Sequence, residues 1–153
     1  MQNKDDFVWY IDENKEYSVI KRGQLSNGQI IQIEFQETIY KKKITYNVVL
    51  TINNKKKQIL QTSEHVTTGR CGLEGLLWAK KAILDFEKYI LEEIKNDKIK
   101  IYIMVMWADN RRRNTYIRGL KNDGYTISKN RWLQMLIKAN CIKWGDYIKW
   151  RRL

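Results

Sequence analysis

Residues 67–75 form the stretch of the chain best suited to binding an anion. They read TTGRCGLEG, and a long segment with helical periodicity follows them. Backbone N–H groups of a glycine-rich turn at a helix N-terminus can surround a phosphate or another anion. The glycine spacing matches neither a Walker A loop nor a dinucleotide-binding fingerprint. We therefore expect an anion site of another kind, whose candidate binding residues are Gly69, Arg70, Gly72 and Gly75.

The reactive side chains near this turn do not match a familiar metal-binding or hydrolase pattern. His65 is the only histidine, and the two cysteines, Cys71 and Cys141, are far apart in the sequence. No two of these three residues have the spacing of zinc ligands on one helix turn or knuckle. A G-x-S-x-G nucleophile motif is also absent. The sequence therefore predicts no metal site.

Two basic clusters offer a different kind of chemistry, the binding of a polyanion. Arginine pairs with phosphates through two parallel hydrogen bonds, and aromatic rings can stack on nucleic-acid bases. The tail residues Trp144, Tyr147 and Trp150 alternate with basic residues, although tryptophans at the end of a chain can also simply close its core. The candidate nucleic-acid-binding residues are Arg111, Arg112, Arg113, Arg118, Lys121, Trp150, Arg151 and Arg152.

The composition is that of a folded basic protein. The chain has 153 residues, 43% of them hydrophobic, and its net charge is +12. This length and apolar content suit a single domain with a substantial core. The charge favours a polyanionic partner, such as CoA, RNA, DNA or an acidic protein face, or else only keeps the protein soluble. The sequence shows no membrane-spanning run and no signal peptide, so we expect a cytoplasmic location and no membrane partner.

Residues 7–61 read as an antiparallel meander of short strands. Segments rich in β-branched and aromatic residues alternate with turn signals such as Asn27-Gly28. One face of such a sheet is apolar and needs cover, and its open edge could pair with a second copy of the chain. The expected strands are 7–11, 17–20, 29–35, 44–52 and 57–61.

Residues 67–127 read as a helix–strand–helix unit that supplies this cover. We expect a helix over 73–94, a central strand over 100–107, a second helix over 112–122 and a short strand over 125–127. Residues 128–153 form a basic, tryptophan-rich C-terminal segment, with a third helix expected over 131–139. The sequence thus predicts a single α+β domain over 1–153. The expected apolar stripe of the first helix consists of Leu73, Leu76, Leu77, Ile83, Leu84, Ile90, Leu91 and Ile94.

From residue 67 to residue 125, the pattern resembles the GNAT superfamily of acyltransferases. In that family an antiparallel meander leads to a glycine-containing turn and a long helix. A strand and a short helix follow, and they end in a Gly-aromatic pair. Here the turn is RCGLEGLL from Arg70 onward, and the pair is Gly124-Tyr125. The resemblance implies binding of acetyl-CoA through Gly69, Arg70, Gly72, Gly75 and Asn110.

Two positions depart from the family pattern. When the motif is aligned on Gly69, Glu74 stands where the family has glycine or alanine, and its carboxylate suits a pyrophosphate only if it points away. The catalytic tyrosine of the family corresponds to Leu120 here. Tyr116 lies one helical turn earlier on the same face and is the candidate acid. Glu64, just before the turn, is the candidate base.

The sequence therefore supports two hypotheses from different classes. The first is a GNAT-like acyl-CoA-dependent N-acyltransferase, which either keeps its chemistry or has lost it. The second is a non-enzymatic basic protein that binds nucleic acid or inhibits a nucleic-acid enzyme such as a nuclease, as accessory proteins of phages and mobile elements do. The glycine-rich turn favours the first hypothesis, whereas the net charge of +12 favours the second.

Overall fold

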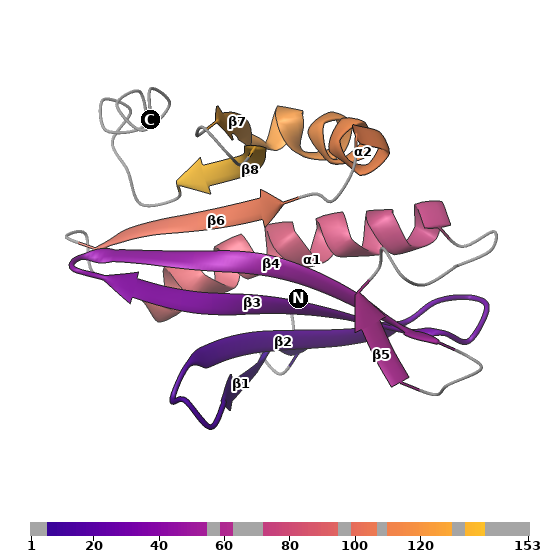
Figure 1. Ribbon diagram of the computed structural model, residues 1–153, viewed down its shortest axis with the longest axis horizontal. Coiled ribbons are helices and arrows are strands. Elements are labelled where there is room, and N and C mark those ends of the chain that lie inside the picture. The colour runs from indigo at the N-terminus through magenta and orange to yellow at the C-terminus, as the bar shows by residue number, and fades with distance from the viewer. Residues whose placement is uncertain are drawn as a thin grey trace.

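A computed structural model of the chain describes residues 6–54, 59–62, 72–94, 99–106, 110–129 and 134–139 (Figure 1). Within these ranges, eight strands form one mixed sheet, and helices pack against it. This arrangement is consistent with the predicted α+β class. The elements are β1 (Val8–Ile11), β2 (Tyr17–Gln24), β3 (Ile30–Tyr40), β4 (Lys43–Asn54), β5 (Ile59–Thr62), α1 (Gly72–Glu93), β6 (Lys100–Met106), α2 (Asn110–Leu120), the 3-10 helix η4 (Lys121–Asp123), β7 (Thr126–Lys129) and β8 (Gln134–Ala139).

The sheet runs in the order β1-β2-β3-β4-β6-β8-β7, and β5 pairs with β4 outside this path. Strands β1 to β5 pair with one another only in antiparallel fashion, which confirms the predicted meander. Among the described pairs, β4 and β6 alone are parallel, and the chain passes through α1 between them. A parallel pair requires such a crossover, because the chain must return to the other end of the sheet before the second strand begins.

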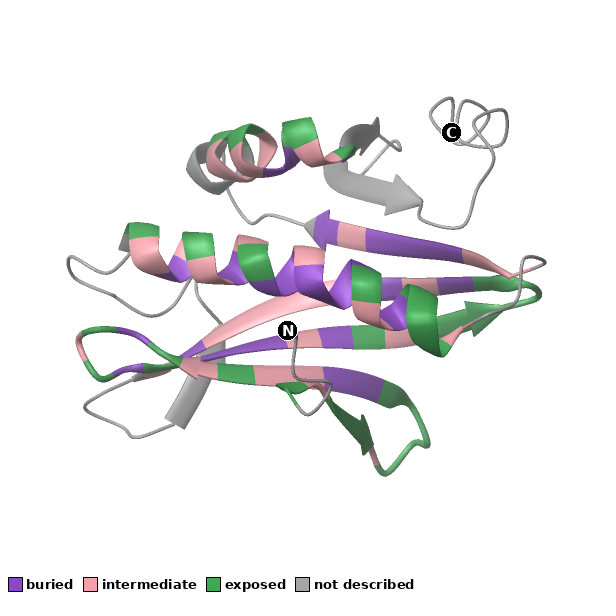
Figure 2. Cartoon of the chain, turned by 180° about the vertical axis from the view of Figure 1, so that it is seen from behind, coloured by how far each residue is buried: buried purple, intermediate pink, exposed green. Residues whose placement is uncertain are grey.

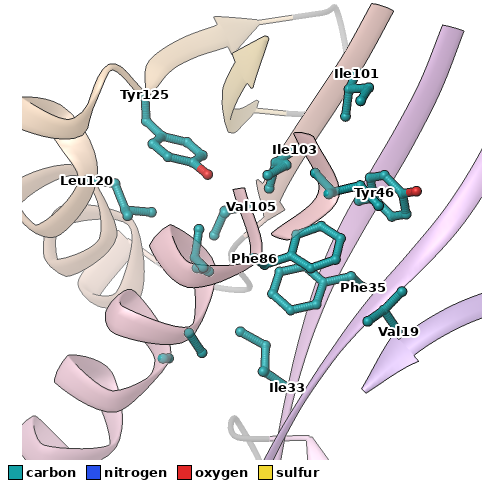
Figure 3. Packing of buried hydrophobic residues seen from close by; sticks show 14 of the residues in the cluster. Val19, Ile33, Phe35, Tyr46, Phe86, Ile101, Ile103, Val105, Leu120 and Tyr125 are labelled. Atoms are coloured by element: carbon teal, nitrogen blue, oxygen red, sulfur yellow. The ribbon is translucent and has the colours of Figure 1, made fainter. Parts of the chain in front are cut away.

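The main core lies between one face of the sheet and α1. The Phe86 ring of α1 stacks on Phe35 of β3 with centroids 3.8 Å apart, and Tyr46 of β4 meets Phe86 edge-on at 5.0 Å (Figure 3). Leu120 and Tyr125 reach the same core from the end of α2 and the residues after η4. The predicted central position of β6 is confirmed, because β6 lies between β4 and β8 and its Ile101, Tyr102 and Ile103 are buried.

The predicted apolar stripe of α1 is only partly correct. Ile83 and Ile90 are buried as expected, but Leu73, Leu77 and Leu91 are exposed (Figure 2). The face that meets the sheet instead includes small residues, which let the helix axis approach the strands closely. These small buried residues are Gly75, Ala79 and Ala82.

The predicted helix over 131–139 is wrong, because Gln134–Ala139 forms strand β8. This strand pairs with β6 on one edge and with β7 on the other. The periodicity of a short apolar run is compatible with either a helix or a strand. Here residues 134–139 form a strand because they pair with β6 and β7. Without β8, the edge of β6 that faces away from β4 would have no partner among the described strands.

Candidate functional site

Two of the residues that the sequence predicted to bind the cofactor, Gly72 and Asn110, lie at one end of the sheet. Because β4 and β6 are parallel, their carboxyl ends lie at the same end of the sheet. The N-termini of α1 and α2 both lie at this end, as Figures 1 and 2 show. Ligands of open sheets with parallel strands bind outside the carboxyl ends of those strands, where helix N-termini present free N–H groups.

The strand β4 changes its partner at this end of the sheet. Its parallel ladder with β6 extends to the pair Val48↔Val105, and its antiparallel ladder with β5 begins at Thr51↔Thr62. Both ladders use the same edge of β4, because β3 occupies the other edge through this region. In the part of the chain that the structure describes, Val49 and Leu50 therefore have no partner strand on that edge. We call this two-residue interruption the β4 gap.

The first turn of α1 presents its donors without a competing carboxylate. The Glu74 carboxylate accepts hydrogen bonds from the backbone N–H and the hydroxyl of Ser26, at 2.8 and 2.6 Å. Ser26 belongs to the turn between β2 and β3, so these two contacts hold the Glu74 side chain against that turn. The first four N–H groups of an α-helix have no acceptor within the helix. In α1 these groups include those of Gly72 and Leu73.

The predicted cofactor-binding residues fall into three groups. Gly72 begins α1 and Asn110 begins α2, so the two helix N-termini at this end contain one predicted residue each. Gly75 is buried and faces the core, where an added Cβ would lie at an ordinary contact distance, 3.5 Å, from Ile31 Cδ1. Gly69 and Arg70 lie outside the described residues.

Of the two predicted catalytic residues, the structure describes only Tyr116. Glu64 lies outside the described residues. Tyr116 is half-buried in α2, and its ring packs against the main core. Leu120, which occupies the position of the family's tyrosine, is buried in the same core.

The predicted nucleic-acid-binding residues gather on α2 as far as the structure describes them. Arg111, Arg112 and Arg113 follow the first residue of α2. Arg118 and Lys121 are exposed at its other end. The remaining candidates, Trp150, Arg151 and Arg152, lie outside the described residues.

Sequence reasoning missed a hydrogen bond between the buried Tyr46 and the half-buried Glu37. The Tyr46 hydroxyl donates a 2.7 Å hydrogen bond to the Glu37 carboxylate. Burial, together with this hydrogen bond, raises the pKa of Tyr46 well above its usual range. The two residues are directly opposite each other on β3 and β4, so only the strand register could have revealed the pair.

The chain matches no protein-family model, no curated protein and no solved structure. Among the described residues, no group of histidine, cysteine, aspartate and glutamate side chains is placed to hold a metal ion. None of the helices in the described ranges has both the length and the apolar character needed to cross a bilayer.

Proposed function

We propose that this protein is a GNAT-like, acyl-CoA-dependent N-acyltransferase that holds acetyl-CoA at the open end of the β4–β6 pair. The proposal depends chiefly on one observation, the convergence of both helix N-termini with the β4 gap at the carboxyl ends of β4 and β6. The order of the elements supports it as well. An antiparallel meander, a long helix, a strand and a shorter helix follow one another and end at Gly124 and Tyr125, as in the family that the sequence resembles.

The orientation of Glu74 removes the main chemical objection to this proposal. A carboxylate in the first turn of α1 would repel a pyrophosphate bound there. Ser26 instead holds the Glu74 carboxylate toward the β2–β3 turn. The N–H groups of Gly72 and Leu73 and the helix dipole then favour a bound anion. The predicted residues Gly69 and Arg70 precede the first turn of α1 in the sequence.

The β4 gap suits the middle of the same cofactor. The pantetheine arm of CoA contains two amide groups, which can pair with a strand edge in the way a peptide does. When bound, acetyl-CoA supplies a reactive thioester. The protein then has to position an amine, accept its proton and stabilise the oxyanion. The assignment of Glu64 as base and Tyr116 as acid remains a prediction.

Isothermal titration with acetyl-CoA tests this site. Leu73 is 69% exposed in the first turn of α1, so Leu73→Glu adds a negative charge beside the proposed pyrophosphate site without disturbing the core. We expect saturable binding by the wild type, and about tenfold weaker binding by this variant if the added repulsion is about 1.4 kcal/mol.

The matched control is Leu91→Glu, the same substitution at an exposed position near the other end of α1. Its affinity for acetyl-CoA should equal that of the wild type. Equal weakening by both variants would show that net charge, and not the first turn of α1, governs binding. A wild-type protein that binds no acetyl-CoA would contradict the proposal itself.

The exposure of Arg118 and Lys121 favours a second candidate function, the non-enzymatic binding of nucleic acid or of a nucleic-acid enzyme. Titration with short single-stranded RNA over a series of salt concentrations tests it. Lys121→Ala should reduce the slope of log K against log [salt] by about 0.7, the value for one phosphate contact on a single strand. Lys88→Ala, which removes an exposed lysine from α1, should leave the slope unchanged. Equal slopes in the wild type, Lys121→Ala and Lys88→Ala would exclude the α2 surface around Lys121 as a phosphate-binding surface for RNA.

A further inference from the structure

The β3–β4 hairpin ends in lysines, and this end of the sheet is the one opposite the proposed acetyl-CoA site. Tyr40 pairs with Lys43, so Lys41 and Lys42 alone join the two strands. Strands β4 and β6 both begin here, and the Lys100 N–H donates to the Lys42 carbonyl at 2.9 Å. The hairpin therefore lies at the amino end of the parallel pair, whereas the N-termini of α1 and α2 lie at its carboxyl end (Figure 1).

Tyr40, Lys43 and Lys100 form a row across the face of the sheet that α1 does not cover. Side chains alternate between the two faces along a strand. Ile44 and Ile101, the next residues of β4 and β6, belong to the main core, so Lys43 and Lys100 face the other way. Tyr40 is directly opposite Lys43, and Lys43 is paired with Lys100 on its other side. We call these three residues the Tyr40 row.

This end of the hairpin presents an aromatic ring together with positive charge. Tyr40 is 67% exposed, and Lys41, Lys42 and Lys43 are exposed beside it (Figure 2). The Lys41 ammonium lies 5.4 Å from the centroid of the Tyr40 ring. Among the described residues, no carboxylate forms an ion pair with any of these three lysines. Their charge is therefore available to an anionic ligand.

The described residues nearest to the Tyr40 row on the same face carry no negative charge. Along β3 these residues are Thr38 and Gln36, which are exposed and can form hydrogen bonds. Glu37 lies on the other face of the sheet, where its carboxylate accepts a hydrogen bond from the Tyr46 hydroxyl. An anion that approaches the row on this face meets lysines and uncharged polar groups.

The combination of ring and charge favours a single-stranded nucleic acid over other polyanions. Proteins bind single strands through cations that hold the phosphates and aromatic rings that stack on the bases. An anionic membrane would meet the charged Lys41 and Lys42 at the tip first, and these side chains do not enter the apolar layer. An acidic protein would pair with the lysines but would leave the Tyr40 ring without a planar partner.

We propose that the Tyr40 row binds single-stranded nucleic acid, with one base stacked on Tyr40 and the adjacent phosphates held by Lys42 and Lys43. Stacking and phosphate contacts accept any base, so we expect little sequence preference. This surface is separate from the α2 surface around Lys121. It also lies at the other end of the sheet from the proposed acetyl-CoA site, so the inference does not depend on acetyl-CoA binding.

Fluorescence anisotropy of a labelled oligo(U) of about ten nucleotides, within the usual site size, tests the stacking contact. We expect saturable, salt-sensitive binding by the wild type. Tyr40→Leu removes the ring and should raise the dissociation constant about fivefold or more, the usual effect of losing one stacked base. Tyr40→Phe keeps the ring and should bind like the wild type.

Tyr10→Leu is the matched control for the loss of the ring. Tyr10 is 54% exposed and lies on the same face of the sheet, because its neighbour Trp9 is opposite the buried Val19. Its variant should bind oligo(U) as tightly as the wild type. Equal weakening by Tyr10→Leu and Tyr40→Leu would overturn the proposal, as would unchanged binding by Tyr40→Leu.

The salt dependence of the same titration tests the phosphate contacts. Lys43→Ala should reduce the slope of log K against log [salt] by about 0.7, the value for one contact on a single strand. Lys88→Ala, at an exposed position of α1, should leave the slope unchanged. Weaker binding by Lys121→Ala, with Tyr40→Leu and Lys43→Ala unchanged, would place the RNA on α2 and contradict the proposal.

Two other polyanions distinguish the remaining partners of these lysines. Polyglutamate of the same charge as the oligo(U) should bind more weakly, and its affinity should not change in Tyr40→Leu. Polyglutamate that binds as tightly as oligo(U) would assign the lysines to an acidic protein. Vesicles of phosphatidylserine that bind the wild type while oligo(U) does not would assign them to a membrane, and either result would overturn the proposal.

Discussion

The buried Tyr46, bonded to the half-buried Glu37, gives the folded protein a defined response to alkaline pH. Burial of the phenol, and its hydrogen bond to Glu37, raise the pKa of Tyr46 above its ordinary value of 10.0. Below pH 10 the folded and unfolded chains both carry the neutral phenol, so this group leaves stability independent of pH. Above that pH, the unfolded chain releases the proton while the folded chain retains it. Stability must then fall as the pH rises.

We therefore expect the free energy of unfolding to decrease above pH 10, by about 1.4 kcal/mol per pH unit for Tyr46 alone. Urea unfolding at a series of pH values measures this slope. Tyr46→Phe should be less stable at neutral pH because Glu37 loses its donor, but its slope should be flatter by about one proton. A variant with the same slope as the wild type would show that Tyr46 ionises normally in the folded state.

Gly23 is required by the close approach of an aromatic side chain. A Cβ at this position would lie less than 3.0 Å from three atoms of the Trp78 indole. We expect Gly23→Ala to lower the free energy of unfolding by about 1–3 kcal/mol, the usual cost of overpacking. In a Trp78→Leu background the same substitution should cost much less, since the clashing ring is gone. Additive costs in the double variant, measured by urea unfolding, would show that the two residues do not compete for space.

The contacts of Glu74 could not be predicted from the residues around it in the sequence. The sequence places Glu74 in the first turn of a helix, near a proposed anion site. Its orientation depends on Ser26, which is 48 residues away in the chain. Only the packing of α1 over the β2–β3 turn brings the two together, so no local pattern could have predicted that the carboxylate points away. Gly75 is similar, because its neighbours are Ile31 of β3 and Leu25 of the β2–β3 turn, which are also distant in the sequence.

At the scale of elements, the bounds of α1 were predicted nearly correctly. The set of α1 residues expected to face the sheet was only partly correct. Its expected stripe consisted of leucines and isoleucines, and helical periodicity alone favours the larger residues. The structure turns Ala79 and Ala82 toward the sheet, while Leu73 and Leu77 remain exposed. Close packing around Phe86 explains the difference, because its stacking on Phe35 needs small neighbours on the helix.

The β1–β2 hairpin contains a position at which a glycine should stabilise the protein. Lys15 has φ of 61°, the left-handed conformation, at the end of a three-residue loop closed by Asp12 and Glu16. Glycine is the usual residue there, because a side chain costs about 1 kcal/mol in that conformation. Lys15→Gly should therefore raise the free energy of unfolding by up to about 1 kcal/mol.

Thermal melting of Lys15→Gly beside Lys15→Ala separates conformation from charge. Both variants remove the lysine, but only glycine relieves the left-handed strain. The glycine variant should melt at the higher temperature. Equal melting temperatures would mean that the strain at residue 15 is negligible.

At the scale of the whole molecule, the sequence predicted the meander, the long helix and the central strand, but not how they join. Alternation identifies strands without stating which ones are neighbours. The parallel pairing of β4 with β6, and the change of β4's partner to β5 after Val48, depend on contacts between distant segments. These same features create the proposed acetyl-CoA site. The sequence could therefore indicate an anion-binding turn, but it could not show the strand edge beside it.

The position of β8 in the sheet leads to a prediction for the chain as a whole. The sequence predicted a basic C-terminal segment over 128–153 with a helix over 131–139, but the structure has β8 there, between β6 and β7. Among the described strands, β7 pairs with β8 alone, and β6 would become an edge without it. A chain that ends at Lys129 loses both ladders and should melt lower by on the order of 10 °C, or aggregate through the new edge.

A chain that ends at Ala139 is the matched comparison, because it keeps all of β8 and removes only residues 140–153. We expect it to unfold cooperatively and at a higher temperature than the chain that ends at Lys129. Circular dichroism melting of the two truncated proteins measures the difference. Equal melting temperatures would mean that β8 adds nothing to the sheet. A clear separation would show that the folded sheet extends beyond Lys129, as the position of β8 implies.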